Sequence, residues 1–451
     1  MMNKQNLATT YNLYLKQKGN TMNDCYNVPN LMPFELAKST LLTNVNTITE
    51  NELIAIQDAD QRILAKPVTS PIQVPAHNNS AMDGYAIRDD SLQADLTESP
   101  TPLSQFKLIG TSMAGSPYKN KLGGNELNNG ECIRIMTGAV VPNSANAVVM
   151  QENVNSQINP ETQDQQITLL HPTKHQANIR FAGEDIQQGH VLFDTGYCLK
   201  AVDIGLLSSL GLSKIDVFRK LKVAVLSTGD ELKMPGQPLQ EGDIYESNSQ
   251  ILIAMLQRLN MSVIPLGIIK DDKTAITNAF IKANREADVV ISSGGVSVGD
   301  ADYTKEVLSE IGTVDFWKVA IKPGKPFAFG KLDNSVFFGL PGNPVSAAVT
   351  FHQLAVPALK YMAGANATAN IQLNATTTSR INKKAGRMDF QRGVMSVSEQ
   401  GNLQVTPLPA QGSGILSSIS RANCYIILAQ ENQGHQAGDT VTIELFDSII
   451  G

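Results

Sequence analysis

Hydrophobic and polar positions follow three successive patterns along the chain, with changes near residues 220 and 364. Residues 28–219 have a mixed pattern, residues 220–363 alternate between apolar runs and amphipathic segments, and residues 364–451 carry short β-like segments. Residues 1–27 are polar and lack an apolar period, so we expect an extension without fixed structure. A chain of 451 residues exceeds the size at which one hydrophobic core stops growing, which fits several domains.

In residues 28–219 the apolar positions indicate helices towards both ends and strands between them. Residues 34–42, 53–64 and 199–210 have apolar side chains at helical spacing, which predicts amphipathic helices. From about residue 70 to residue 193, short β-like runs are interrupted by Gly, Pro and Asn. The sequence therefore predicts a mixed α+β domain that contains a β-rich subdomain.

Residues 220–363 have the clearest periodicity of the chain. Apolar runs predict strands at residues 222–226, 263–269, 289–291, 314–321, 327–329 and 336–338. Amphipathic segments predict helices at residues 249–259, 273–287, 304–311 and 344–362. Strands that alternate with helices are typical of a mostly parallel sheet covered on both faces, so we expect a three-layer α/β domain.

After residue 364 the helical period disappears. Short β-like segments at residues 405–408, 425–428 and 441–445 predict a compact β domain with a barrel-like or sandwich fold. The expected fold class is thus multidomain α/β plus β.

Composition and charge narrow the classes of function. The chain is 42% hydrophobic and 17% charged, and its net charge of −6 with no basic run gives no reason to expect nucleic-acid binding. No apolar run is long enough to span a membrane. The four cysteines lie far apart without a C-x-x-C pair, which argues against a zinc site or a disulfide framework and fits a reducing cytoplasm.

Five polar loops follow the strands of the predicted α/β domain, and ligands of open α/β sheets bind at such strand ends. The loops occupy residues 227–231, 270–272, 292–302, 322–326 and 340–344. The loop SSGGVSVGDAD (292–302) combines glycines, which let the backbone approach a ligand, with serines suited to phosphate oxygens. Its candidate binding residues are Ser292, Gly294, Gly295 and Ser297.

The same edge of the predicted sheet brings carboxylates next to lysines. The carboxylates are Asp230, Glu231, Asp271, Asp300 and Asp302, and the lysines are Lys318, Lys322 and Lys325. This combination suits a phosphate or another oxyanion accompanied by a divalent metal such as Mg²⁺. Pro344 places the start of the last predicted helix at this edge as well.

Each segment also has a simpler interpretation. Asp272 fits the N-cap of the helix that follows it. In the N-terminal domain, NNSAMDGYA (78–86) is typical of a surface turn, IRIMTGA (133–139) of a strand and turn, and RFAGED (180–185) of a surface ion pair. The coincidence of five polar loops at one edge nevertheless favours a functional site.

Several long motifs resemble one family. They are NSAMDGYA (79–86), RIMTGA (134–139), STGDEL (227–232), SSGGVSVG (292–299), ADYTK (301–305), IKPGKPFAFGK (321–331), GLPGNPVSA (339–347) and DFQRG (389–393). In this order they resemble the molybdopterin molybdenumtransferases, or molybdenum insertases, a family that includes MoeA and the E domain of gephyrin. The resemblance extends from about residue 28 to the C-terminus.

The resemblance implies a reaction and partners. Molybdate is inserted into the dithiolene of adenylylated molybdopterin, and the adenylate is hydrolysed in a magnesium-dependent step that releases AMP. The family implies a cytoplasmic homodimer whose site combines the α/β edge of one subunit with the N-terminal domain of the other. A molybdopterin adenylyltransferase and recipient molybdoenzymes are further partners that the family suggests.

The resemblance also assigns roles to residues. The catalytic candidates are Asp83, Asp185, Glu231, Lys318 and Lys322. The candidates for substrate binding are Thr137, Arg180, Ser292, Gly294, Gly295, Ser297, Lys325, Pro341, Pro344 and Ser413. The candidates for holding Mg²⁺ are Asp271 and Asp302.

The chain departs from the common family pattern at three places. Asn78 stands where an aspartate is frequent, and only Arg180 is left of a basic cluster before Gly-Glu-Asp. Glu246, in the segment YESN, stands where aspartate is more usual.

Two other functions remain open. A molybdopterin adenylyltransferase shares the α/β domain, but those proteins lack the NSAMDGYA region and the C-terminal β domain. A partner-binding scaffold of the gephyrin E type is the third hypothesis. The chain lacks a second fused α/β domain and a long linker, which disfavours a dedicated scaffold.

Overall fold

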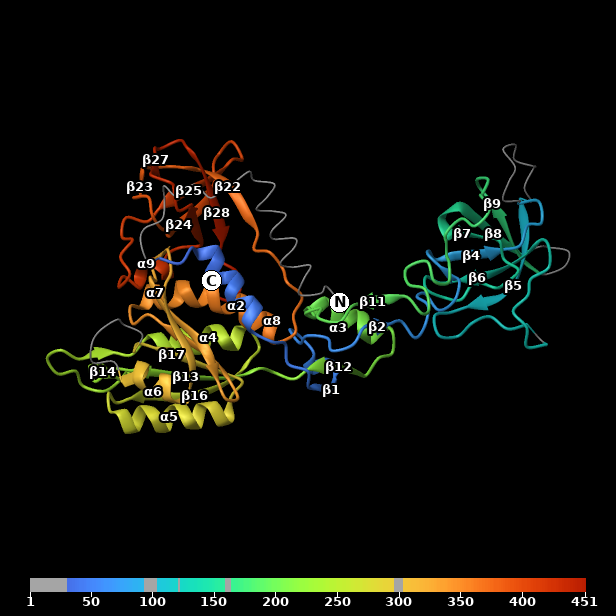
Figure 1. The fold of residues 1–451 in the computed structure, drawn as a ribbon. Coiled ribbons are helices and arrows are strands. Elements are labelled where there is room, and N and C mark those ends of the chain that lie inside the picture. The colour runs from blue at the N-terminus through green and yellow to red at the C-terminus, as the bar shows by residue number, and fades with distance from the viewer. Residues whose placement is uncertain (1–30, 93–103, 121, 159–163, 296–302) are drawn as a thin grey trace. The chain divides into compact units, whose positions relative to one another are not determined.

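The computed structural model describes residues 31–92, 104–120, 122–158, 164–295 and 303–451, and the chain forms two compact units. The first unit contains the described parts of Met1–Lys66, together with Thr195–Ile204 and Lys214–Gly451. The second contains the described parts of Pro67–Asp194 and the short stretch Gly205–Ser213. Figure 1 shows the elements of each unit.

The first unit begins with helix α2 (Phe34–Asn44), as the apolar period predicts. The helix predicted at residues 53–64 is wrong, because this segment forms strand β1 (Asn51–Ala55) and the short 3-10 helix η2 (Ile56–Asp58). Strand β1 pairs antiparallel with β12 (Lys214–Phe218), so a partner distant in sequence overrides the local period. Gln61 has a φ of 57°, a left-handed conformation that ends any helical continuation. Helix α3 (Ala201–Ser209) confirms the helix predicted at residues 199–210.

The second unit is β-rich, as predicted. Its main sheet has the order β7-β4-β6-β5-β9-β8. These strands are β4 (Gly84–Ile87), β5 (Gln105–Ser112), β6 (Glu131–Ile135), β7 (Ala147–Met150), β8 (Val154–Ile158) and β9 (Gln165–Leu169), with η3 (Gln151–Asn153) between β7 and β8. Two short ribbons pair β2 (Val68–Thr69) with β11 (Val191–Phe193) and β3 (Asn79–Ser80) with β10 (Ile179–Arg180).

The α/β part of the first unit has a six-stranded sheet of order β16-β13-β17-β21-β20-β18. The parallel strands are β13 (Lys222–Thr228), β16 (Ser262–Ile269), β17 (Val289–Ser293) and β21 (Val336–Leu340). Strands β18 (Gly312–Lys318) and β20 (Pro326–Leu332) are antiparallel to their neighbours. The strand predicted at residues 314–321 is interrupted, because β19 (Ile321–Lys322) pairs with a strand of the C-terminal domain instead.

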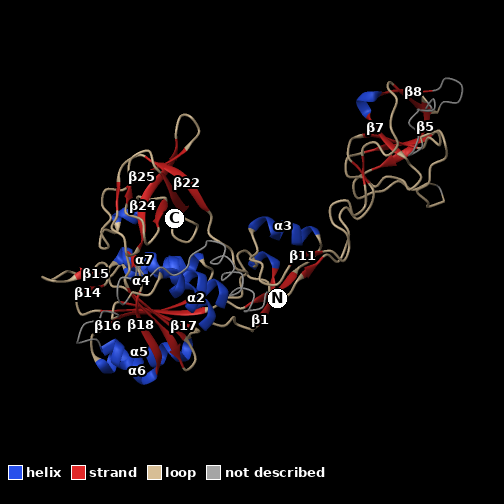
Figure 2. Cartoon of the chain, turned by 45° about the horizontal axis from the view of Figure 1, so that its top comes forward, coloured by secondary structure: helices blue, strands red, loops and turns tan. Residues whose placement is uncertain are grey.

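Helices cover both faces of this sheet, which confirms the three-layer fold. They are α4 (Asn248–Arg258), α5 (Lys273–Glu286), α6 (Tyr303–Ile311), α7 (Pro344–Thr350) and α8 (Val356–Met362), the last two joined by the π-helical turn η4 (Phe351–Ala355). One core contains residues of α4, α7, α8 and α2, and a second core contains residues of α5 and α6. Figure 2 shows α5 and α6 on one side of the sheet and α4 and α7 on the other. Asp272 caps α5 through Ala275 N–H at 2.8 Å, as the sequence predicts.

The C-terminal part is a closed barrel of five strands, which the β-like segments predict only in outline. Its order is β24-β25-β22-β28-β26, and the pairing of β26 with β24 closes it. The strands are β22 (Gln372–Thr377), β24 (Met388–Val397), β25 (Leu403–Pro407), β26 (Cys424–Leu428) and β28 (Thr440–Leu445). A ribbon of β23 (Ile381–Asn382) and β27 (Gly434–His435) and the short helix α9 (Ser417–Ser420) complete this part.

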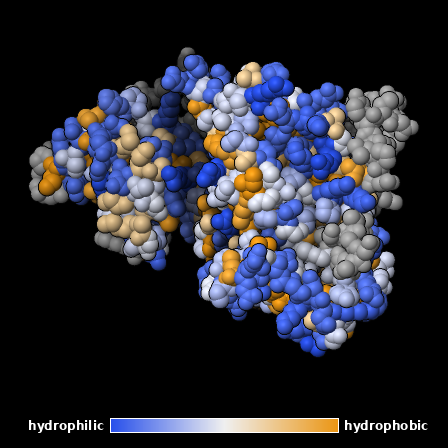
Figure 3. Space-filling model, turned by 90° about the vertical axis from the view of Figure 1, so that its left-hand side faces the viewer, coloured by the Kyte–Doolittle hydropathy of each residue, from blue (hydrophilic) through white to orange (hydrophobic). Residues whose placement is uncertain are grey.

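No helix within the described ranges combines the length and the hydropathy that crossing a membrane requires. The face drawn in Figure 3 is mostly hydrophilic, with apolar side chains in smaller groups between polar ones.

Candidate active site at the strand ends of the α/β sheet

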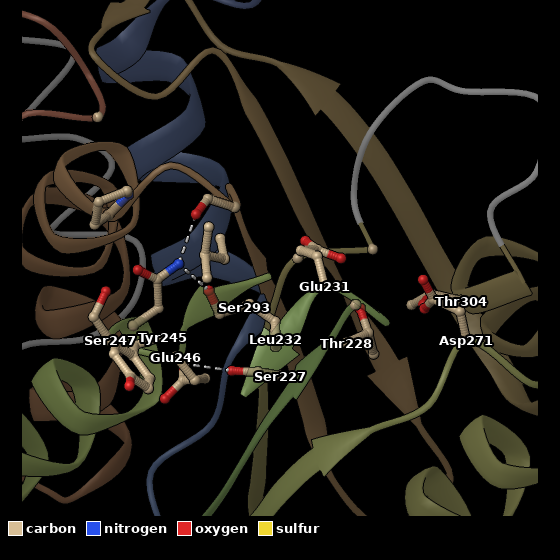
Figure 4. A pocket seen from close by; sticks show the side chains of 18 of the residues that line it. Ser227, Thr228, Glu231, Leu232, Tyr245, Glu246, Ser247, Asp271, Ser293 and Thr304 are labelled. Atoms are coloured by element: carbon tan, nitrogen blue, oxygen red, sulfur yellow. Dashed lines mark hydrogen bonds between the residues drawn. The ribbon is translucent and has the colours of Figure 1, made fainter. Parts of the chain in front are cut away.

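A pocket of about 710 Å³ lies at the carboxyl ends of β13, β17 and β21 (Figure 4). Four of the five predicted loops contribute to its lining. The lining includes Ser227, Thr228, Gly229 and Glu231 after β13, Asp271 before α5, Ser293, Gly294 and Gly295 after β17, and Gly342 and Pro344 after β21. Strand order explains the position, because the chain leaves β13 towards β16 but returns past it to β17. Ligands of open α/β sheets bind at such a switch point.

The glycines after β17 bring the backbone close to the neighbouring loops. Gly294 has a φ of 88°, and a Cβ built there would lie 2.8 Å from the carbonyl oxygen of Thr228. Gly295 has a φ of 64°, and its Cβ would lie 2.5 Å from Thr304 Oγ1. Both positions therefore require glycine, as the phosphate-loop interpretation of this segment expects. Ser292 is fully buried and donates to the carbonyl oxygen of Gly294 at 3.2 Å, so it supports the loop without lining the pocket.

Carboxylates gather on one side of the pocket. Burial raises the pKa of Asp271, and the negative charges of Asp230 and Glu231 raise it further. The backbone N–H of Asp271 donates to Asp230 Oδ1 at 3.2 Å, so the loops after β13 and β16 touch here. Figure 4 shows Glu231, Thr228 and Asp271 along the same wall. A group of like charges with a raised pKa is stabilised by a cation.

A metal would need ligands beyond this group. In the described ranges, no three His, Cys, Asp or Glu side chains converge tightly enough to hold a metal ion by themselves. Mg²⁺ commonly binds through one or two protein carboxylates, and waters and substrate phosphates complete its shell. Asp271 and Glu231 therefore fit such a partial donor set. Three predicted residues, Ser297, Asp300 and Asp302, lie outside the described residues.

The lysines lie elsewhere, which differs from the mixed edge that the sequence pattern predicts. None of the three predicted lysines lines this pocket: Lys318, Lys322 and Lys325 are all absent from its wall. Lys318 ends β18 opposite Pro326, and Lys322 donates from Nζ to Asp389 Oδ2 at 3.1 Å. The physical reason is that β19 leaves the α/β sheet and pairs with β24, which carries Lys322 towards the barrel.

Lys322 lines a second pocket of about 700 Å³ beside the barrel. Its other ionisable residues are Arg380, Lys383, Lys384, Arg387, His435, Asp389 and Asp439. Burial lowers the pKa of Lys383; the charges of Asp389 and Glu431 oppose this shift, and those of Lys322 and Arg387 add to it. Basic side chains outnumber acidic ones in the lining. This pocket is therefore basic, whereas the pocket at the strand ends is acidic.

Ser413 is close to the strand-end pocket. Its carbonyl oxygen accepts from the backbone N–H of Val345 at 3.1 Å, in the first turn of α7. Gly414 and Leu416 of the same segment line the pocket. The segment that follows the barrel strand β25 thus forms part of the wall. Pro341 does not line the pocket, whereas Pro344 does.

In the second unit, the structure brings Asp83 and Thr137 together. Asp83 Oδ1 accepts from Thr137 N–H and from its hydroxyl, both at 2.7 Å. These bonds, the backbone one first, lower the pKa of the exposed Asp83 carboxyl. Arg180 belongs to β10, and within the described residues no ion pair joins it to Asp185. The backbone N–H of Asp185 donates to the carbonyl oxygen of Val74 at 3.1 Å.

Sequence reasoning missed Glu246 and Asn248, which line the strand-end pocket. In the sequence, the segment YESN that contains them is distinguished only by a glutamate in place of the usual aspartate, and nothing in it indicates a position at the pocket. Thr228, Ser293 and Thr304 line the pocket as well. They lie within the motifs STGDEL, SSGGVSVG and ADYTK, but sequence reasoning did not single them out as binding residues.

Three family models match the chain in order. The MoeA N-terminal region (domain I and II) matches residues 32–211, a probable molybdopterin binding domain matches residues 224–361, and the MoeA C-terminal region (domain IV) matches residues 374–446.

Curated relatives and solved structures agree with these matches. The chain is 44% identical to the molybdopterin molybdenumtransferase of Haemophilus influenzae, over 93% of this chain and 100% of the relative. It is 35% identical to the enzyme of that name from a Nostoc species, over 72% of each chain. The crystal structure of a molybdopterin biosynthesis MoeA protein from Pyrococcus horikoshii OT3 matches with a TM-score of 0.75 and 30% identity, over 92% of this chain and 100% of that one. The chain belongs to the MoeA family of molybdopterin molybdenumtransferases.

Proposed function

We propose that this protein is a molybdopterin molybdenumtransferase that inserts molybdate into adenylylated molybdopterin and releases AMP in a magnesium-dependent reaction. The observation that carries the proposal is the pocket in which the glycine pair Gly294–Gly295 faces the carboxylates Glu231 and Asp271. Family membership supplies the class of reaction, and the pocket supplies a place for a phosphate-bearing substrate.

The glycine pair would receive the phosphates of the substrate. Because neither glycine leaves room for a side chain, the backbone forms the wall on which phosphate oxygens would rest. The hydroxyl groups of Thr228, Ser293 and Thr304 line the same pocket and can donate hydrogen bonds to an oxyanion.

Asp271 would hold Mg²⁺ together with Asp302, which lies outside the described residues, and Glu231 lines the pocket with Asp271. When bound, the ion would neutralise phosphate charge and polarise the bond to be broken. The raised pKa of Asp271 supports this role, since a carboxyl beside two others gains most from a nearby cation. The side chain of Glu231 would orient the attacking water or accept a hydrogen bond from it.

Lys322 belongs to a different pocket, so we assign it to anion attraction near the barrel. An oxyanion such as molybdate is attracted by lysine as a point charge. Lys318 and Lys325, which lie on either side of the β18–β20 connection, would add to this field.

We further propose a cytoplasmic homodimer. In it the exposed Asp83–Thr137 pair, with Arg180 and Asp185, would face the strand-end pocket of the partner subunit. Asp83 is held ionised and exposed by two donors, which suits a group that acts on a neighbouring molecule. The free thiols of Cys132, Cys198 and Cys424 fit a reducing compartment.

The test incubates the purified protein with adenylylated molybdopterin, molybdate and Mg²⁺ and measures AMP and active cofactor. We expect both products, and neither without Mg²⁺. Absence of AMP and cofactor under all conditions would refute the proposal. Formation of adenylylated molybdopterin from ATP and molybdopterin would instead identify an adenylyltransferase.

A further inference from the structure

Two side chains at the start of α4 connect three of the loops that line the strand-end pocket. Asn248 Nδ2 donates to Ser293 Oγ at 2.8 Å and to the carbonyl oxygen of Gly342 at 2.7 Å. Glu246 is 3% exposed and accepts from Ser227 Oγ at 3.0 Å, a bond drawn in Figure 4. The loops after β13, β17 and β21 are therefore joined through one short segment.

The sheet itself does not hold these loops at a fixed spacing. The parallel ladders end at the pairs Ser227–Ser293 and Ser293–Leu340. One further backbone bond, from Gly294 N–H to the carbonyl oxygen of Leu340 at 3.2 Å, joins the loops after β17 and β21. Gly342 lies beyond that bond, at the wall of the pocket. Its distance from the glycine pair therefore depends on side chains.

Asn248 is suited to set this distance and unsuited to bind a substrate anion. Both hydrogens of its amide group are used by Ser293 and Gly342, so no donor is left for a ligand. The segment that carries it is itself anchored, because Glu246 also accepts from Ser249 N–H at 2.7 Å. This bond satisfies one of the N–H groups that the first turn of α4 leaves without a helical partner.

We infer that Asn248 is a positioning residue, which fixes the spacing between the glycine pair after β17 and the loop after β21, while Glu246 anchors its segment to β13. The pocket is thereby pre-organised before substrate enters. A binding site whose walls are held in place avoids the cost of ordering them on binding. Only the nucleotide measurement below rests on the proposed function.

Three variants separate the two bonds of Asn248. Asn248→Ala removes both. Asn248→Asp keeps the shape of the side chain and can still accept a hydrogen bond from the Ser293 hydroxyl. It places an oxygen against the carbonyl oxygen of Gly342, so only the hydrogen bond to Gly342 is lost. Ser293→Ala removes only the other bond. The matched control is Gln250→Ala, at an exposed position in the first turn of the same helix.

The first measurement is amide hydrogen exchange in the full-length protein without ligand. In Asn248→Ala we expect exchange to accelerate about tenfold at Gly294, whose N–H bonds to Leu340, and at Val345, whose N–H bonds to Ser413 after the loop that carries Gly342, with exchange in α5 unchanged. Asn248→Asp should accelerate exchange at Val345 more than at Gly294. Acceleration throughout the α/β domain would indicate a purely structural role and overturn the inference, as would exchange equal to wild type.

The second measurement is the dissociation constant of AMP in the presence of Mg²⁺. We expect Asn248→Ala to raise it about tenfold while the unfolding temperature stays close to that of Gln250→Ala, since water can replace a bond at the pocket wall. An unchanged dissociation constant together with unchanged exchange contradicts the positioning role. If wild-type protein does not bind AMP, the proposed function fails, and the exchange experiment still decides the inference.

Discussion

Asp83 accepts two hydrogen bonds from Thr137, one from the backbone N–H and one from the hydroxyl, both at 2.7 Å. The two residues are 54 positions apart in the sequence, in the motifs NSAMDGYA and RIMTGA. Strands β4 and β6 bring them together, because Gly84 pairs with Ile135 in the antiparallel ladder. Two separate sequence motifs are therefore one structural unit.

Thr137→Ala removes only the hydroxyl donor to Asp83. Because the backbone bond remains, the fold should persist, but Asp83 should be less firmly oriented and AMP release should fall about tenfold. Thr137→Ser, which keeps the hydroxyl, is the matched control and should retain most of the activity. AMP release by chromatography is the measurement, and equal rates for the alanine and serine variants would contradict the role.

The stability of the protein should respond to pH through Asp271. Its pKa is raised in the folded state above the unfolded value of about 3.9, so the folded state holds the proton more tightly. By proton linkage, stability falls as the pH rises from the pKa of Asp271 in the unfolded state through its pKa in the folded state. Above that range the loss of stability is complete and no longer changes with pH. Asp271→Asn should therefore flatten this part of the stability profile. The measurement is the free energy of unfolding in urea between about pH 3.5 and about pH 7.

Mg²⁺ should restore part of the stability that is lost when Asp271 ionises. Wild type should gain unfolding temperature on addition of Mg²⁺ at neutral pH, because a ligand that binds only the folded state stabilises it. Asp271→Asn should lose this gain and its turnover, although its unfolding temperature without Mg²⁺ should equal or exceed that of wild type. We expect Asp302→Ala to lose Mg²⁺-dependent turnover as well. A full Mg²⁺ response in Asp271→Asn would refute the metal role of Asp271.

The ion pair of Lys322 and Asp389 allows stability and function to be separated. Asp389 is buried at 3% side-chain exposure, whereas Lys322 is 41% exposed. Because solvent screens the exposed partner, Lys322→Ala should lower the free energy of unfolding by about 1–2 kcal/mol, which is less than the loss expected when a fully buried ion pair is broken. The double variant Lys322→Ala with Asp389→Asn should recover most of this stability in urea unfolding.

Turnover should respond differently from stability. If Lys322 attracts the anionic substrate, the double variant should remain impaired in AMP release, because the positive charge is still missing. Recovery of both stability and turnover in the double variant would show that Lys322 serves only to balance Asp389.

Gly294→Ala tests the close approach of the backbone in the pocket. The substituted residue would be strained at a φ of 88° and would meet the Thr228 carbonyl at 2.8 Å, for a combined cost of about 2–4 kcal/mol. Gly242→Ala is the control, because its φ of 94° carries the same strain with no atom within 4 Å of the new Cβ. Affinity for AMP should fall only in Gly294→Ala, by titration calorimetry. Equal losses in both variants would mean that strain alone matters.

Much of the α/β domain was predictable from local pattern. Its strands are continuous apolar runs because both faces of the sheet are covered, so β13 and β17 are recognisable one by one. Asp272 was predictable as a helix cap, since that role depends on bonds within three residues. The pocket residues Glu231, Gly294 and Gly295 were predictable from their position, because each follows a strand that the apolar pattern reveals.

The sequence by itself thus determined the family, the fold class and the polar strand ends, because these depend on short segments and on the period of apolar residues. Tertiary structure decided what depends on distant partners. It turned the expected helix at residues 53–64 into β1 by pairing it with β12, and it carried Lys322 away from the acidic pocket by pairing β19 with β24. It also made Asn248 a link between Ser293 and Gly342, which lie 45 and 94 positions away. Hydrogen bonds between such distant residues leave no periodic signal along the chain, so only the folded structure reveals them.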